Sequence, residues 1–165
     1  MNPSITQGVS NDKRIKEHID ANVFLETITD DSEFVAQCTR ILGKFTSSNP
    51  IYIGVFSTPS LGEITQNIIF KLGGARAMAF EFLYKLCKDR GVKIFTPTLK
   101  TYEIIEELRL LNGYLKSMDT LILACAIADR ARIFVTLDTD FIGNERFIAE
   151  VKEKYGLLIK NASKV

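Results

Sequence analysis

Apolar residues along the chain form two kinds of pattern, and the two kinds alternate. Short continuous runs that are rich in β-branched and aromatic residues, such as IYIGVF at 51–56, predict strands buried on both faces. Between these runs, apolar residues recur every three or four positions, as in FVAQCTRILGKF at 34–45, which predicts helices. By this criterion we expect strands at 15–20, 51–56, 92–97, 131–137 and 157–159.

Capping residues, proline and glycine set the helix boundaries. Asp30, Asp31 and Ser32 offer caps for the helix at 34–45, and Thr58-Pro59 opens the next helix, which Gly73-Gly74 ends. The segment TLILACAIA at 120–128 is apolar on every side and predicts a helix in the core. Further helices are expected at 75–90, from Thr98 or Lys100 to 111, at 117–130 and at 145–154.

Strands that alternate with helices predict an α/β fold in which a central, mostly parallel sheet lies between two helical layers. The length of 165 residues fits one domain, which we expect at 13–165, after a polar and flexible extension at 1–12. In open sheets of this class, ligands bind beyond the carboxyl ends of the strands. That edge is therefore where functional residues are sought.

Composition narrows the class of protein. Hydrophobic residues make up 46% and charged residues 25%, which is typical of a globular protein, and the net charge of +1 provides no general basic field for nucleic acid. The three cysteines are isolated from one another, as expected for buried small residues in a reducing compartment. No apolar run reaches the length of a membrane span, and the polar N-terminus has no signal-peptide pattern. We therefore expect a cytoplasmic protein without a membrane partner.

Acidic residues gather at the predicted carboxyl edge of the sheet. Asp20 ends the first strand, Glu63 and Asp119 lie in the first turns of two helices, and Asp138 ends the strand IFVTL, with Asp140 two residues later. Each acid also has a simple structural explanation: an Asx turn at Asp20, a capping box of Ser60 with Glu63, a helix cap at Asp119 and a turn at Asp138.

Convergence of these acids would require a cation. Two carboxylates about 4 Å apart repel by about 4 kcal/mol at an effective dielectric constant of about 20. Several converging carboxylates therefore need protonation or a bound metal. Ligation by oxygen alone favours Mg²⁺ or Mn²⁺.

The ordered series IDANVF, PSLGEI, MDTLILACAIA and VTLDTDF resembles the PIN-domain ribonucleases, including the VapC-type toxins. It runs from Asp20 to Phe141, and only the long helical hairpin around Gly73-Gly74 and the N-terminal extension depart from the pattern. The resemblance implies a PIN-like fold and a metal-dependent endoribonuclease, either the toxin of a toxin–antitoxin pair or an RNA-processing nuclease. It also implies roles for seven residues: Asp20, Glu63, Asp119 and Asp138 as catalytic and metal-binding acids, Asp140 as a further metal-binding acid, and Asn22 and Thr136 as polar groups that orient the carboxylates.

RNA as substrate follows from the resemblance and requires cations near the site. We expect these to be Lys100, Arg130 and Arg132, with Lys71, Arg76 and Lys116 as further candidates. An antitoxin protein is an expected partner if the protein is a toxin. A homodimer is expected through apolar residues of the helical hairpin, namely Phe70, Met78, Phe82 and Tyr84.

Other interpretations of the same residues stay open at this point. One is a PIN-like module that binds RNA or protein without catalysis. Another is a haloacid-dehalogenase-like phosphatase with Asp20 as nucleophile, although that chemistry needs a second acid where Asn22 stands. A receiver domain is a related α/β fold, but its paired acids before the phosphorylated aspartate are missing.

Overall fold

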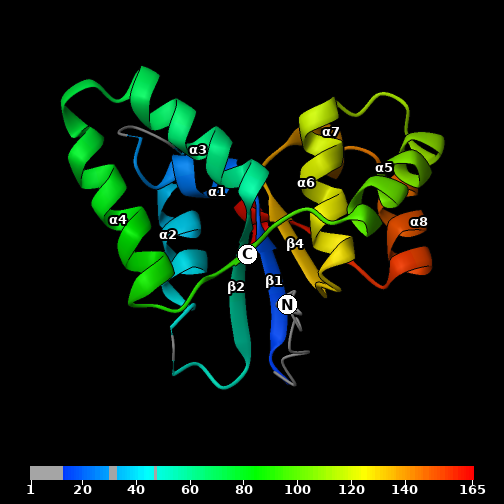
Figure 1. Ribbon diagram of the computed structural model, residues 1–165, viewed down its shortest axis with the longest axis horizontal. Coiled ribbons are helices and arrows are strands. Elements are labelled where there is room, and N and C mark those ends of the chain that lie inside the picture. The colour runs from blue at the N-terminus through cyan, green and yellow to red at the C-terminus, as the bar shows by residue number, and fades with distance from the viewer. Residues whose placement is uncertain (1–12, 30–32, 47) are drawn as a thin grey trace, which may run out of the picture.

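Five strands form one parallel sheet at the centre of the computed structural model, which describes residues 13–29, 33–46 and 48–165. The strand order is β3-β2-β1-β4-β5, and each pair of neighbours is parallel (Figure 1). The mostly parallel sheet expected from the sequence is thus confirmed. The strands are β1 (Ile15–Ile19), β2 (Tyr52–Ser57), β3 (Lys93–Phe95), β4 (Ile133–Thr136) and β5 (Leu158–Asn161).

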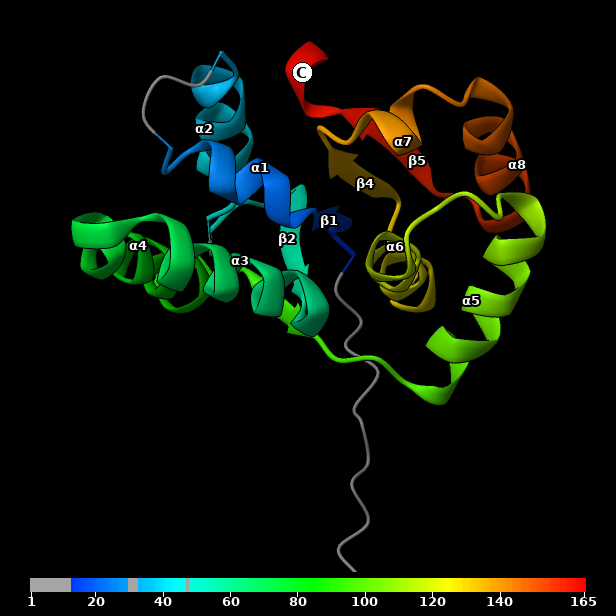
Figure 2. The same cartoon turned by 90° about the horizontal axis from the view of Figure 1, so that it is seen from above.

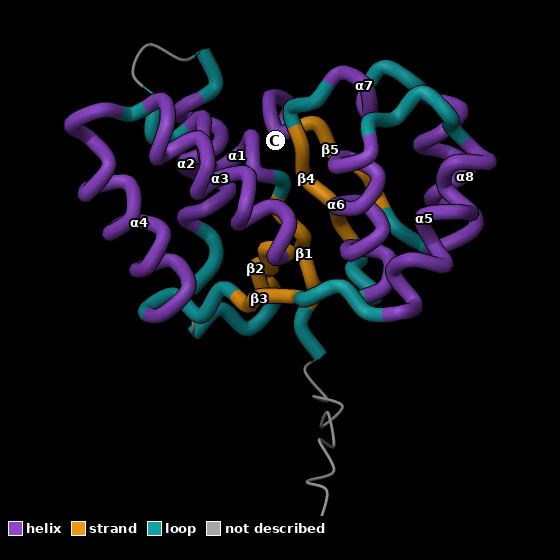
Figure 3. The backbone as a smooth tube through the Cα atoms, turned by 45° about the horizontal axis from the view of Figure 1, so that its top comes forward, coloured by secondary structure: helices purple, strands orange, loops and turns teal. Residues whose placement is uncertain are grey.

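Helices cover both faces of the sheet. Seen from above, α1 to α4 gather on one side and α5 to α8 on the other (Figure 2). The strands consequently lie in the middle of three layers, as expected (Figure 3). The helices are α1 (Ala21–Glu26), α2 (Val35–Gly43), α3 (Thr58–Lys71), α4 (Arg76–Lys88), α5 (Leu99–Leu111), α6 (Ser117–Ala128), α7 (Thr139–Ile142) and α8 (Glu145–Tyr155), with short 3-10 turns at Gly73–Ala75 and Ala162–Lys164.

The central strands are apolar at successive positions because each face of the sheet has its own core. In β4, Ile133 and Val135 belong to the core shared with α1 to α4, whereas Phe134 belongs to the core shared with α5, α6 and α8. Successive side chains of a strand point to opposite faces, so a strand between two helical layers needs apolar residues on both. The helix α6 is buried from Ile122 to Ile127, which confirms the core helix expected from its sequence.

Two groups of charged side chains accompany the buried polar residues of the first strand. Glu17 is buried and receives the ammonium group of Lys44 at 2.6 Å. On the other face, His18 is buried and its Nε2 lies 3.0 Å from a carboxylate oxygen of Asp129, which Lys16 also contacts. Buried charges are tolerated where such partners exist.

Some local expectations differ from the structure. The helices α1 and α7 were not predicted, because segments of six and four residues are too short to show a helical period. Phe82, expected on the surface, stacks on Phe24 with ring centroids 5.4 Å apart, while Phe70, Met78 and Tyr84 are exposed. The extension at 1–12 and the expected caps Asp30, Asp31 and Ser32 lie outside the described residues.

Among the described residues, no helix combines the length and the apolar content needed to cross a lipid bilayer.

Candidate metal centre

The strand order creates a natural place for a site between β1 and β4. From β1 the chain continues to α1 on one side of the sheet, and from β4 it continues to α7 on the other (Figure 2). The connections therefore diverge at the carboxyl edge of these two neighbouring strands, which is the arrangement that leaves a crevice in open α/β sheets. Asp20 follows β1 as the N-cap of α1, and Asp138 follows β4 as the N-cap of α7.

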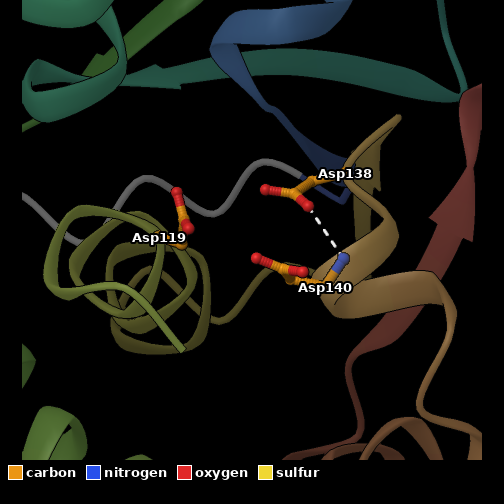
Figure 4. A group of neighbouring side chains, drawn as sticks. All are labelled: Asp119, Asp138 and Asp140. Atoms are coloured by element: carbon orange, nitrogen blue, oxygen red, sulfur yellow. Dashed lines mark hydrogen bonds between the residues drawn. The ribbon is translucent and has the colours of Figure 1, made fainter. Parts of the chain in front are cut away.

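Three of the predicted acids meet beside this point. Asp119, Asp138 and Asp140 each offer one carboxylate oxygen, and these oxygens lie within 4.8 Å of one another. Figure 4 shows the carboxylates of Asp138 and Asp140, from the start of α7, directed toward Asp119 in the first turn of α6. The Asp138 carboxylate is also held by the backbone N–H of Asp140, which donates to Oδ1 at 2.8 Å. One cation could contact all three residues.

Asp119 differs from Glu17, whose Oε2 is also buried without a partner among the described residues but whose Oε1 pairs with Lys44. The Oδ2 atom of Asp119 is buried and has no hydrogen-bond partner among the described residues. Burial raises the pKa of Asp119, the neighbouring Asp138 raises it further, and Lys116 opposes the shift in part. A buried, unpartnered carboxylate oxygen is costly unless something positive approaches it. The donor set therefore fits a cation with oxygen ligands.

Asp20 and Glu63 lie around this group without belonging to the set within 4.8 Å. Burial is the main reason that the pKa of Asp20 is raised to about 7, and Glu63 and Asp119 add to the shift. Burial also raises the pKa of Glu63, and the charge of Asp138 raises it further. The predicted acids thus influence one another electrostatically, and the positive charge of Lys116 offsets their mutual repulsion only in part.

Asn22 and Thr136 hold the Asp20 carboxylate. The Thr136 hydroxyl donates to Oδ2 of Asp20 at 2.6 Å, and the Asn22 side-chain amide donates to the same oxygen at 2.9 Å. Thr136 also accepts from the backbone N–H of Asp138 at 2.9 Å. Through Thr136, the acid after β1 is connected to the acid after β4.

The simple structural explanations account for some of the acids only. Asp20 and Asp138 do act as helix caps, accepting from the N–H groups of Ala21 and Asp140. The capping box of Ser60 with Glu63 is absent, because α3 begins at Thr58 and its cap is Ser57. Asp119 caps nothing either, since the N-cap of α6 is Lys116.

The cations expected near the acids require a correction. Lys100, Arg130 and Arg132 line a cavity at the amino edge of β4, past the far end of α6. The 12 residues of α6 span about 18 Å at about 1.5 Å per residue, so this cavity lies well away from Asp119. Of the further candidates, Lys116 does reach the acids, with its Nζ 3.3 Å from an Asp140 carboxylate oxygen, and the charge of Lys71 lowers the pKa of Glu63. Lys116 is the N-cap residue of α6.

Comparison with known structures supports the fold. A VapBC2 complex from Rickettsia felis bound to a promoter DNA fragment is 16% identical, with a TM-score of 0.60 over 89% of this chain and 98% of that one. FitAcB from Neisseria gonorrhoeae is 15% identical (TM-score 0.61; 90% and 99% covered). VapC20 from Mycobacterium tuberculosis, a toxin that cleaves the sarcin-ricin loop, is 14% identical (TM-score 0.59; 77% and 93% covered). No curated protein matches the chain.

The sequence itself carries the family assignment. Residues 18–145 match the family profile described as the PIN domain. This match covers most of the chain and includes all five acids described above. The chain belongs to the PIN domain family, and at the level of the family it is a nuclease.

Proposed function

We propose that this protein is a divalent-metal-dependent endoribonuclease that hydrolyses RNA phosphodiester bonds. The observation that carries the proposal is the unpartnered Oδ2 of Asp119, buried beside the carboxylates of Asp138 and Asp140. Helix capping explains neither this atom nor the closeness of three acids, whereas a bound Mg²⁺ or Mn²⁺ explains both.

Each acid has a specific part in this proposal. Asp119, Asp138 and Asp140 would hold the ion, while Asp20 and Glu63 would contribute negative charge and further oxygen ligands. Thr136 and Asn22 orient Asp20 through the hydrogen bonds described above. When bound, the ion supplies Lewis-acid activation of a water molecule and offsets the charge that develops at phosphorus.

Lys116 would contact the substrate. Its ammonium group partly compensates the acids, and Asp140 in turn raises the pKa of Lys116. With Asp140 engaged as an ion ligand, the lysine would be free to bind a phosphate oxygen of the nucleic acid. His18 has no part in this chemistry, because it is buried against Asp129 near the middle of the sheet.

RNA and an antitoxin are the proposed partners. The similar structures include toxin–antitoxin complexes, and one is a toxin that cleaves an RNA loop, which supports an RNA target and a toxin role for this chain as well. Looped or single-stranded RNA is the proposed form, because its exposed bases and flexible backbone can reach acids at the edge of a sheet. We also propose a homodimer through the exposed Phe70, Met78 and Tyr84 of the α3–α4 hairpin.

Cleavage of labelled single-stranded RNA by wild type and Asp119→Asn, with Mg²⁺, Mn²⁺ or EDTA, tests the proposal. We expect metal-dependent cleavage that falls by about a hundredfold or more in the variant, because the ion loses a ligand. Arg146→Gln is the matched control, since Arg146 is exposed on α8 and pairs only with Glu150 among the described residues.

Two other outcomes would contradict the proposed activity. Cleavage that persists in EDTA or in Asp119→Asn would reject the metal-dependent mechanism. Metal binding by calorimetry without cleavage of any RNA would leave the ion site and favour a PIN-like module that binds RNA or protein without hydrolysis.

A further inference from the structure

The cavity at the amino edge of β4 is a second place where chemistry could occur. Its volume is about 790 Å³, which is within the range of cavities that hold small molecules. Four cations line it, Lys100, Arg130, Arg132 and Lys154, together with one carboxylate, Glu107. The cavity therefore has an excess of positive charge in a protein whose total net charge is only +1.

The single carboxylate is already engaged. Glu107 receives the Tyr155 hydroxyl at 2.7 Å and the Lys154 ammonium group at 2.9 Å. Lys100 pairs with Glu103 at 3.1 Å. In contrast, the guanidinium groups of Arg130 and Arg132 have neither an ion pair nor a hydrogen bond with the described residues. Two arginines thus remain available for an anion.

The backbone at Arg130 adds an independent observation. Arg130 has φ 56°, and it is the only residue other than glycine with positive φ in the described part of the chain. It follows the last turn of α6, at the position that glycine or asparagine usually occupies, because a Cβ atom is strained there. A long charged side chain at such a position costs stability without improving the helix end. Strain of this kind is typically found where a side chain has a function.

The rest of the lining is apolar and aromatic. Ile127 and Ala131 are buried and line the cavity, as does the partly buried Tyr155. A simple anion would need only the guanidinium groups. A cavity lined by two arginines and by apolar and aromatic side chains fits a flat, largely apolar group that carries a phosphate.

We propose that this cavity binds a nucleoside phosphate, with the phosphate on Arg130 and Arg132 and the base against Ile127, Ala131 and Tyr155. The ligand is either a free nucleotide or the terminal nucleotide of an RNA chain. The site lies at the opposite edge of the sheet from the acids, and it does not depend on the proposed nuclease activity.

Calorimetric titration of the full chain in EDTA tests the proposal, because without a divalent ion the acidic group has no means of binding phosphate. The probes are AMP, inorganic phosphate and a short 5′-phosphorylated oligoadenylate. The test variant is Arg130→Asn with Arg132→Gln, since asparagine tolerates the left-handed backbone of position 130. The control variant, Lys88→Gln with Arg146→Gln, removes the same charge elsewhere.

We expect saturable AMP binding that weakens by about tenfold or more in the test variant and is unchanged in the control. If the oligoadenylate binds more tightly than AMP through the same arginines, the ligand is an RNA terminus; if AMP binds more tightly, it is a free nucleotide. The proposal is overturned if AMP does not bind, if both variants bind equally, or if inorganic phosphate binds as tightly as AMP.

If the double variant of Arg130 and Arg132 does not fold, a single variant still tests the proposed nucleotide site. The single variant Arg130→Gly removes one guanidinium and relieves the strain at φ 56°, so it should fold at least as well as wild type. Loss of AMP affinity in this variant would support the site, and retention of full affinity would contradict it.

Discussion

The two ends of α6 treat the same residue type in opposite ways. At the C-terminal end, Asp129 is bound by Lys16 and His18, and these hydrogen bonds lower its pKa although burial acts to raise it. At the N-terminal end, Asp119 has a buried oxygen without a partner among the described residues, and burial and Asp138 raise its pKa. Asp129 thus has cationic groups in direct contact, whereas Asp119 has Lys116 nearby but no ion pair within the described part of the chain. The comparison distinguishes a carboxylate that stabilises the fold from one that is prepared for an external ion.

Matched substitutions at the two ends should have different effects on stability. Asp129→Asn removes the charge that Lys16 and buried His18 contact, so we expect the free energy of unfolding to fall by about 2 kcal/mol. Asp119→Asn removes repulsion with Asp138, and we expect stability to stay within about 1 kcal/mol of wild type in EDTA. Urea unfolding monitored by circular dichroism measures both. Equal losses in the two variants would show that both acids are structural.

The stability of the protein should also depend on pH in opposite ways near the two ends of α6, through Asp20 beside Asp119 and through His18 beside Asp129. The folded-state pKa of Asp20 is raised to about 7 from an ordinary value of 3.8, so between these values the folded state binds more protons than the unfolded state. The contribution of Asp20 to stability is therefore full at low pH and is lost as the pH rises toward about 7. His18 acts in the opposite direction: burial lowers its pKa below 6.5, and its contribution is present above about 6.5 and lost as the pH falls.

Single variants separate the pH dependence of stability that comes from Asp20 from the pH dependence that comes from His18. In EDTA, the stability of Asp20→Asn relative to wild type should increase from pH 4 to pH 8, by up to about 4 kcal/mol for a shift from 3.8 to about 7. His18→Gln should instead remove the loss of stability of wild type below about pH 6.5. Urea unfolding over this pH range, repeated with Mg²⁺ for wild type, provides the measurement. A pH-independent difference between Asp20→Asn and wild type would mean that Asp20 is ionised normally.

Substitution of Thr136 should have the smallest effect, because it changes how the Asp20 carboxylate is held without removing that carboxylate. Thr136→Val removes the hydrogen bond to Asp20 and the acceptor for the Asp138 N–H, so we expect a loss of about 1 to 2 kcal/mol in stability. RNA cleavage should also fall, by about tenfold, while Thr136→Ser should retain most of both properties. If Thr136→Val weakens folding but leaves the metal dependence of cleavage unchanged, Thr136 is structural only.

The fold and the position of the acids could be predicted from the sequence because they depend on local patterns. Strand ends and first helical turns are readable, and parallel strands bring their carboxyl ends to one edge, so Asp119, Asp138 and Asp140 could be expected to meet. The partners of Asp129 could not be found in this way, because Lys16 is 113 residues away and becomes a neighbour only when β1 pairs with β4.

Arg130 and Arg132, which were expected near the acids, show a second limit of prediction from the sequence. Arg130 and Arg132 directly precede β4, so strand direction alone assigns them to the amino edge, away from Asp138. Their charge suggested an association with the acids that their position in the strand contradicts. The cavity that they line also depends on α5 and α8, whose packing against the end of α6 no local pattern predicts.

The central position of β1 next to β4 has a kinetic consequence. Thr136 and Asp20, which join the two halves of the proposed site, are 116 residues apart in sequence. Contacts between such distant segments form late in folding, after the local helices and the β1–β2 pair. An ion that also uses Asp20 then lacks part of its ligand set in the transition state, so it should slow unfolding more than it speeds folding. Mg²⁺ would then prolong the lifetime of the native protein more than it helps a new chain to reach it.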